Sequence, residues 1–211
     1  MLKVIVIILI KNHQSKTNLI MKKNILKSIV FVSLALLGCE NFKTNTETSY
    51  EAQTTLNDQI ERGKEMVEII GCNDCHSPKI MTERGPIPDP NRLLSGHNSN
   101  EELPVFDSET SKAYVLFNMN GTAVVGPWGT SFSGNLTPDD TGIGTWSETQ
   151  FMRAMKKGLY KGLEGSRQLL PPMPWQGYSK MKDEDLKAIF AYLKSIKPVK
   201  NIVPQPIPPQ V

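Results

Sequence analysis

Two of the three cysteines in this 211-residue chain stand beside a histidine, in the segment Gly71-Cys72-Asn73-Asp74-Cys75-His76. Two thiols three residues apart at the end of a helix can each form a thioether with one vinyl group of a porphyrin, and the adjacent imidazole then lies under the iron. The C-x-x-C-H pattern is typical of the attachment of a c-type haem. It constrains the fold strongly, because the porphyrin becomes part of the chain.

Three other uses of Cys72 and Cys75 fit the residues less well. A redox-active C-x-x-C pair is expected at a helix start beside a β-α-β pattern, which this sequence lacks. A structural zinc site needs two further ligands, and His97 is the one other histidine downstream of Cys39. A structural disulfide leaves His76 unexplained. We therefore predict one covalently bound haem c, attached through Cys72 and Cys75, with His76 as an iron ligand.

The N-terminus carries a second signal, which concerns location. Met21-Lys22-Lys23-Asn24 is positively charged, Ile25 to Leu37 is mostly apolar, and Leu36-Leu37-Gly38-Cys39 ends with a small residue before a cysteine. This resembles a bacterial lipoprotein signal, which implies cleavage before Cys39 and a lipid on its thiol. The positively charged region stands at the N-terminus, as such a signal requires, only if translation begins at Met21. An uncleaved transmembrane helix is the alternative, but the apolar run is short for a bilayer.

Removal of residues 1–38 would reverse the net charge. The full chain has a formal charge of +3, but the removed segment contains six lysines and no acidic residue, which leaves 18 basic and 21 acidic side chains. Nothing in the mature chain provides the clustered basic footprint that nucleic-acid binding needs. We expect an exported, periplasm-facing protein that is lipid-anchored to a bacterial membrane and does not bind nucleic acid.

The second axial ligand decides what a haem protein does, because iron with two protein ligands is closed and suited to electron transfer. The strongest candidate is Met173, in the segment Leu169-Leu170-Pro171-Pro172-Met173-Pro174-Trp175. The prolines fix backbone φ on both sides of Met173 and lower the freedom of the loop. Met181 and His97 are the other candidates. Methionines in helical patterns are expected to fill the core instead, namely Met66, Met152 and Met155.

Apolar residues at helical spacing predict three helices. The first covers about residues 57–71 and ends at the haem motif. The second has Ser147 as its N-cap and Gln150 as its capping-box partner, and it runs to about Lys157 before Gly158. The third runs from Asp183 to Lys197, with acidic residues in its first turn, and Pro198 stops it.

The sequence divides into four predicted segments. Residues 1–38 are the upstream segment and signal peptide, residues 39–56 are a flexible tether, residues 57–200 are the haem domain, and residues 201–211 are a Pro-rich tail, either extended over the surface or mobile. Within the domain, the stretch 77–146 is long. There, segments 113–119 and 122–128 flank Asn120-Gly121, which predicts a hairpin with a two-residue turn.

The order of these features resembles that of class I cytochromes c, in a bacterial lipoprotein form. Segments similar to those of a bacterial monohaem family are Ser133-Gly134-Asn135-Leu136-Thr137-Pro138, Thr141-Gly142-Ile143-Gly144-Thr145-Trp146 and Pro171-Pro172-Met173-Pro174-Trp175. The resemblance covers about residues 57–205. It implies an all-α class I cytochrome c fold, with an inserted loop and β-hairpin region between the haem motif and the later helices.

The resemblance also implies roles for individual residues. Cys72 and Cys75 would form the thioethers, and His76 and Met173 would be the two axial ligands. The terminal helices would cross where a small residue, Gly63, lets Tyr192 or Leu193 pack closely. A carbonyl near Gly85-Pro86 is a candidate to receive the ring N–H of His76.

These features favour an electron-transfer protein without catalytic residues of its own. It would move single electrons between a dehydrogenase or respiratory complex and an acceptor such as an oxidase, with no substrate chemistry. A haem enzyme or gas sensor with a displaceable sixth ligand is the alternative. A binding module without a working redox couple is a third hypothesis.

Overall fold

The computed structural model describes residues 44–209, with side chains from residue 55 onwards. The predicted signal peptide over residues 1–38 and the lipid-bearing Cys39 lie outside the described residues. The chain divides into two units, Met1–Thr54 and Thr55–Val211. The second unit contains the haem motif. None of the helices within residues 44–209 is both long and apolar enough to cross a membrane.

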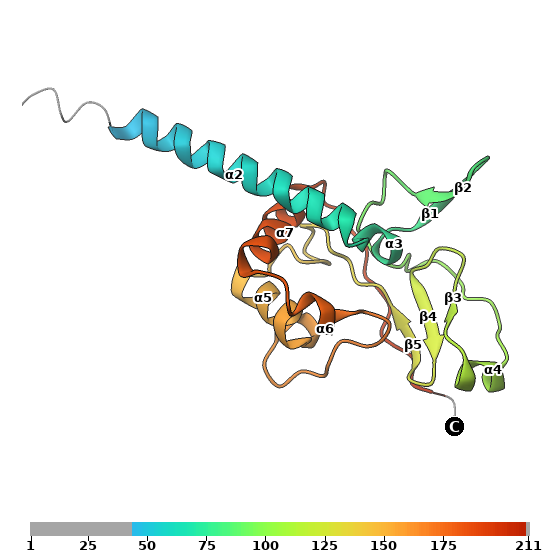
Figure 1. The fold of residues 1–211 in the computed structure, drawn as a ribbon. Coiled ribbons are helices and arrows are strands. Elements are labelled where there is room, and N and C mark those ends of the chain that lie inside the picture. Colours follow the sequence, from blue (N-terminus) through green and yellow to red (C-terminus); the bar gives the residue numbers. More distant parts are fainter. Residues whose placement is uncertain (1–43, 210–211) are drawn as a thin grey trace, which may run out of the picture. The chain divides into compact units, whose positions relative to one another are not determined.

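Helices and two small sheets alternate along the described chain (Figure 1). The helices are α2 (Thr44–Ile69), α3 (Cys72–His76), α4 (Ser108–Ala113), α5 (Glu148–Lys157), the 3-10 turn η1 (Tyr160–Gly162), α6 (Trp175–Tyr178) and α7 (Asp183–Ser195). The strands are β1 (Lys79–Thr82), β2 (Gly85–Pro88), β3 (Leu116–Phe117), β4 (Ala123–Gly126) and β5 (Gly129–Phe132).

Helix α2 begins at Thr44, well before the predicted start at residue 57. Much of the segment predicted as a flexible tether therefore has helical backbone. The physical reason is that α2 contains no proline and only one glycine, and its Glu and Gln residues are good helix formers. The helix ends before Gly71, whose φ of 70° turns the chain into α3.

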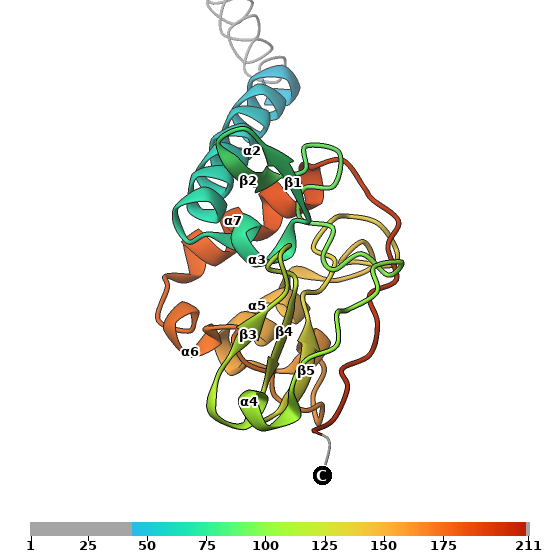
Figure 2. The same cartoon turned by 90° about the vertical axis from the view of Figure 1, so that its right-hand side faces the viewer.

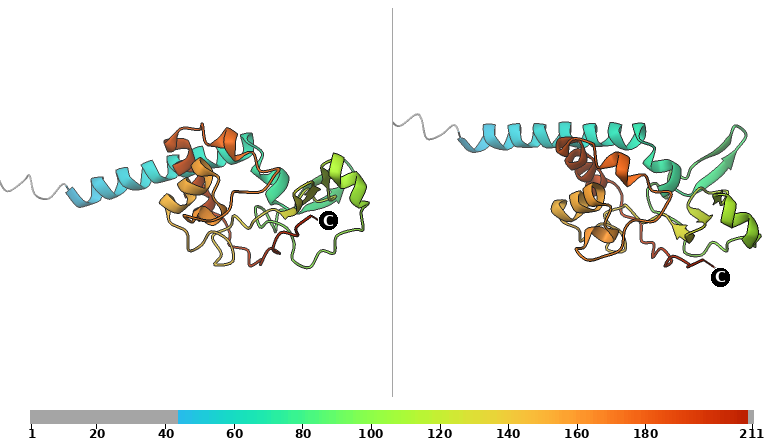
Figure 3. Two further views of the ribbon diagram at one scale, coloured as in Figure 1. Left: turned by 90° about the horizontal axis from the view of Figure 1, so that it is seen from below. Right: turned by 60° about the horizontal axis from the view of Figure 1, so that its bottom comes forward.

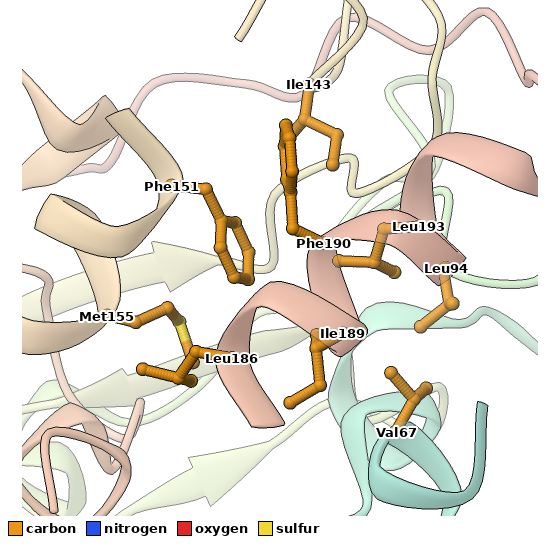
Figure 4. Close-up of a cluster of buried hydrophobic side chains, with 9 residues drawn as sticks. All are labelled: Val67, Leu94, Ile143, Phe151, Met155, Leu186, Ile189, Phe190 and Leu193. Atoms are coloured by element: carbon orange, nitrogen blue, oxygen red, sulfur yellow. The ribbon is translucent and has the colours of Figure 1, made fainter. Parts of the chain in front are cut away.

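Helix α7 packs across α2 at Gly63. A Cβ atom at this position would overlap the backbone oxygen of Ala188 and lie 2.9 Å from the Cβ of Tyr192. The close approach expected at Gly63 thus involves Tyr192 together with Ala188. The core forms where α2, α5 and α7 meet (Figure 4), and its buried side chains are Val67, Leu94, Ile143, Phe151, Met155, Leu186, Ile189, Phe190 and Leu193.

Helix α5 occupies the range that its sequence predicts. Ser147 caps it, because its Oγ accepts a hydrogen bond from the amide of Gln150 at 3.1 Å, and Gly158 ends it with a φ of 65°. The Gln150 side chain does not complete the capping box. It donates to the carbonyl of Lys161 at 2.7 Å, which ties α5 to the following turn.

A three-stranded antiparallel sheet, in the order β3-β4-β5, lies where Asn120-Gly121 predicts a hairpin (Figure 2). The turn is longer than two residues, because Oδ1 of Asn118 accepts hydrogen bonds from the amides of Thr122 and Ala123. Strand β5 was not predicted. A second pair, β1 with β2, forms a separate hairpin that follows the haem motif directly (Figure 3).

The C-terminal segment lies extended along the domain, which is one of the two arrangements expected for it. Ile207 and Thr130 exchange backbone hydrogen bonds of 2.8 and 3.0 Å. The buried side chain of Asn201 donates to the carbonyls of Ser95 and His97, both at 2.7 Å. The folded domain therefore includes residues beyond the predicted boundary at 200.

Candidate functional site

One cavity of about 180 Å³ brings the haem motif and the Pro-flanked methionine together. Cys72, Cys75 and His76 line it from α3, and Met173 lines it from the loop before α6. Most of the remaining lining is apolar and includes Val124, Phe132, Leu136, Phe151, Met155, Leu170, Pro171, Pro172, Pro174 and Pro206. An apolar cavity with a few convergent polar groups is the usual form of a cofactor site.

The ring of His76 is oriented by a backbone carbonyl. Its Nδ1 lies 2.8 Å from the oxygen of Gly134, so Nδ1 carries the proton and Nε2 is the nitrogen left for a metal. The expectation that a carbonyl near Gly85-Pro86 would take this role is wrong. Those residues form strand β2 and pair with β1 instead, because the short stretch after His76 closes into a hairpin.

The segment containing Gly134 is held by Asn135. The Asn135 side chain is 6% exposed, and its Oδ1 accepts from the amide of Thr137 at 2.9 Å. Its Nδ2 donates to the carbonyl of Val199 at 2.8 Å. These hydrogen bonds fix the loop between β5 and α5 and thereby place the Gly134 oxygen beside His76.

Cys72 and Cys75 are free thiols in the structure. Burial raises the pKa of Cys72 to about 12, and burial also raises the pKa of Cys75. A redox-active C-x-x-C pair works through a thiol whose pKa is lowered. The environment of α3 therefore argues against a disulfide-exchange site. It leaves two neutral thiols facing an apolar cavity.

The two other candidates for the second axial ligand, His97 and Met181, are not among the residues that line the cavity. His97 is 1% exposed, its Nδ1 lies 2.9 Å from Oγ1 of Thr122, and its ring centroid is 4.8 Å from that of Phe132. Met181 packs against the hydrophobic core. Of the sequence candidates for a second axial ligand, Met173 is the one brought to the cavity with His76. Of the methionines expected in the core, Met155 is buried within it, and Met66 and Met152 are partly buried and pack against the core cluster.

The loop that carries Met173 is fixed from strand β5. Oγ of Ser131 donates to the carbonyl of Pro171 at 2.6 Å. The amide of Met173 donates to the carbonyl of Leu170 at 3.3 Å, and the amide of Trp175 donates to the carbonyl of Met173 at 2.9 Å. The methionine thus sits in a tight turn held at one point by the inserted sheet.

Among the lining residues that were not predicted from the sequence are three with polar or charged tips, namely Tyr160, Arg167 and Tyr178. The guanidinium of Arg167 lies 4.0 Å from the ring centroid of Tyr160, and the hydroxyl of Tyr178 donates to the carbonyl of Ile70 at 3.2 Å. Arg167 is the one lysine or arginine among the described residues that line the cavity. Tyr160 and Arg167 lie in the stretch 158–168, where the sequence has no extended helical or strand period, and Tyr178 lies in the four-residue helix α6, which the sequence did not predict.

No protein-family model matches the chain, but it is similar to parts of several longer proteins. It is 41% identical over 88 residues to one of the subunits of nicotinate dehydrogenase from Pseudomonas putida. It is 39% identical over 85 residues to the fructose dehydrogenase cytochrome subunit of Gluconobacter japonicus, and 40% identical over 81 residues to the gluconate 2-dehydrogenase cytochrome c subunit of Pantoea cypripedii.

These three matches cover 41%, 39% and 37% of this chain. They cover 7%, 17% and 18% of the respective relatives, so the chain matches less than a fifth of the length of each. The relatives include cytochrome subunits of dehydrogenases. The similarity, found beside a C-x-x-C-H segment at an apolar cavity, supports the cytochrome c family for this chain, with haem c as its cofactor.

Proposed function

We propose that this chain is a membrane-anchored monohaem c-type cytochrome that transfers single electrons between a dehydrogenase or respiratory complex and an acceptor. The observation that carries the proposal is that Cys72, Cys75, His76 and Met173 line one apolar cavity. The similarity to dehydrogenase cytochrome subunits supports electron transfer with a dehydrogenase as partner. A class I cytochrome c fold with an inserted sheet region is part of the same proposal.

When bound, haem supplies a one-electron couple at its iron. Cys72 and Cys75 would hold it through thioethers, and Nε2 of His76 would bind the iron. The hydrogen bond from His76 Nδ1 to Gly134 fixes the plane of the imidazole and makes the ring a better donor to the metal. The thioether of Met173, which lines the same cavity, would take the sixth position and favour the reduced state relative to a second imidazole.

The rest of the lining has two further effects. Apolar side chains such as Phe132, Leu136 and Phe151 would keep water away from a bound haem iron, which would raise the cost of its more highly charged oxidised state. Arg167, which lines the cavity and lies over the ring of Tyr160, would supply a positive charge to pair with an acidic substituent of the porphyrin.

The test of six-coordination is the optical spectrum of the reduced protein with carbon monoxide. We expect no binding at neutral pH for the native chain, since Met173 closes the iron. Met173→Ala should bind carbon monoxide readily. The matched control is Met181→Ala, which removes a methionine that packs on the core but does not line the cavity, and it should leave the spectrum unchanged.

Two results would overturn parts of the proposal. Ready binding of carbon monoxide by the native reduced protein would favour a haem enzyme or gas sensor with a displaceable sixth ligand. An unchanged spectrum in Met173→Ala would remove Met173 as a ligand. The haem content per chain, measured from the pyridine adduct against protein mass, tests the single haem.

The lipid anchor rests on the sequence around Cys39. Expression with a radiolabelled fatty acid should label the native chain, whereas Cys39→Ser should remain unlabelled and leave the membrane fraction. Equal labelling of the two proteins would contradict the anchor without affecting the haem site.

A further inference from the structure

Three backbone carbonyls of the haem-motif segment are bound by one lysine. The ammonium of Lys79 donates to the oxygens of Asn73, Asp74 and Ser77 at 2.9, 2.9 and 2.5 Å. An ammonium group has three protons, so each carbonyl has its own donor. Asn73 and Asp74 are the two residues between the predicted thioether cysteines. The lysine therefore binds the segment that would carry the haem.

The position of this ammonium is favourable for the helix. The last carbonyls of a helix have no partner inside it and give its C-terminal end a partial negative charge. Helix α3 is only five residues long, too short to be stable by itself. Lys79 supplies both the missing donors and a compensating charge. Its side chain is half-buried, so solvent screens that charge less than it would at the open surface.

The other end of Lys79 is held by the inserted sheet. Its amide donates to Oδ1 of Asn120 at 3.0 Å, and Nδ2 of Asn120 donates to Oε2 of Glu101 at 2.8 Å. The other carboxylate oxygen of Glu101 accepts from Nδ2 of Asn118 at 2.8 Å. The turn also touches α3 directly, since a Cβ at Gly121 would lie 2.9 Å from the oxygen of Asp74.

We propose that Lys79 is a positioning residue of the haem couple, and that the turn between β3 and β4 holds it in place. The inference rests on the proposed function. Lys79 binds the haem-motif segment and keeps a fixed positive charge beside it. Oxidation adds one positive charge to the haem iron, so a nearby ammonium destabilises the oxidised state. The turn between β3 and β4 thereby tunes the reduction potential through Lys79.

The opposing charge is Asp74, whose side chain is exposed on the same segment. Its field is screened by solvent more strongly than that of the half-buried ammonium. Loss of the ammonium has a second effect in the same direction, because three carbonyl oxygens that point their negative ends at this position would lose their donor. Both effects favour the oxidised protein.

The experiment is a spectroelectrochemical titration of the holoprotein. Lys79→Met should lower the equilibrium constant for reduction by about tenfold, which for one electron is about 59 mV. Lys79→Arg keeps the charge and the donors, so its reduction potential should stay close to the native value. The matched control is Lys112→Met, which removes an exposed lysine of α4 that pairs with Glu109 at 2.7 Å, and it should leave the potential unchanged.

The outcomes separate this inference from the proposed function. If the native chain lacks a covalent haem, the proposed function fails before any variant is measured. If all variants bind haem with the native spectrum and Lys79→Met has the native potential, the role of Lys79 is wrong. An equal shift in Lys112→Met would also overturn it, because the effect would then be one of net charge.

A second variant keeps the inference testable if Lys79→Met accumulates poorly. Asn120→Ala retains every charge but frees the amide of Lys79 from the inserted turn. We expect a shift in the same direction that is several times smaller. A native potential in Asn120→Ala, with the spectrum intact, would show that the turn does not position the lysine.

Discussion

On one wall of the cavity, Cys72, Cys75 and His76 lie on or at the end of a short helix that is bound from several directions. Gly134 accepts from the imidazole, Lys79 binds the backbone, and Oγ of Ser77 donates to Oδ1 of Asn73 at 2.7 Å. We call this side the attachment wall. Another part of the lining, which we call the methionine wall, is a proline-rich turn of residues 170–174 that is fixed from β5 through Ser131.

The difference between the walls indicates that they have different roles. The attachment wall combines a local motif with hydrogen bonds from two segments, residues 77–79 and the loop at Gly134, so a single lost contact leaves the others in place. The methionine wall has a single side-chain hydrogen bond from outside its own turn among those described. We infer that the attachment wall determines whether haem is retained, whereas the methionine wall determines how readily the sixth position opens.

The largest expected effect is on the attachment wall. Cys72→Ser combined with Cys75→Ser removes both thioether donors, so haem should be lost completely from the denatured chain. Haem staining after denaturing electrophoresis and the intact mass measure this. Met173→Ala, on the methionine wall, is the control and should retain covalent haem. Haem that stays with the doubly substituted chain under denaturing conditions would break the comparison.

The next largest effect is on the unfolding free energy, through substitutions at two helical glycines. Gly63→Ala places a methyl group against the backbone of Ala188 where α2 packs on α7, and we expect a loss of about 1–3 kcal/mol in unfolding free energy. Gly177→Ala, in α6 after the methionine wall, meets nothing within 4 Å and should be neutral or slightly stabilising. Denaturant unfolding measures both. Equal stabilities would show that the contact at Gly63 is relaxed in solution.

A smaller effect is expected from the anchor of the methionine wall. Ser131→Ala removes the hydrogen bond to Pro171, which contributes about 1 kcal/mol, or roughly a fivefold change in an equilibrium. Added imidazole should therefore displace Met173 from the haem iron of the oxidised variant about fivefold more readily than in the native protein. Ser111→Ala, which removes a hydroxyl that donates to Ser108 within α4, is the control. If the two variants bind imidazole alike, β5 does not hold this wall.

The smallest effect is a pH dependence that originates away from both walls. Burial lowers the pKa of His97, with the charge of Glu101 opposing the shift and that of Arg92 adding to it. The folded protein therefore binds a proton at His97 less readily than the unfolded chain, in which His97 has the usual pKa of 6.5. Its contribution to stability is complete above this pH and falls as the pH drops toward the lowered pKa of the folded state.

His97→Asn should remove this contribution. The slope of unfolding free energy against pH, just below pH 6.5, should be shallower in the variant than in the native protein. The difference between the two slopes cancels the contribution of His76, which both proteins share. Parallel slopes would mean that His97 titrates normally in the fold.

Much of the helical framework could be predicted from the sequence. The range of α5 follows from the cap at Ser147 and from Gly158, and the start of α7 follows from its acidic first turn. Such signals are local, because a cap or a helical period involves residues within a few positions of one another. The haem motif is equally local, since its five residues lie in one short helix.

What the sequence could not determine depends on residues far apart along the chain. The partner of His76 is Gly134 rather than a residue near Gly85, and the anchor of Met173 is Ser131. The link from Asn120 through Lys79 to the haem-motif segment likewise joins an inserted turn to α3.

By itself, therefore, the sequence predicted the two thioether cysteines, the histidine ligand and a preferred methionine. Only the tertiary structure decided that this methionine, and not His97 or Met181, shares a cavity with His76. The physical reason is that hydrogen-bond partners across a fold are selected by packing, and packing of distant segments leaves no periodic pattern in the chain.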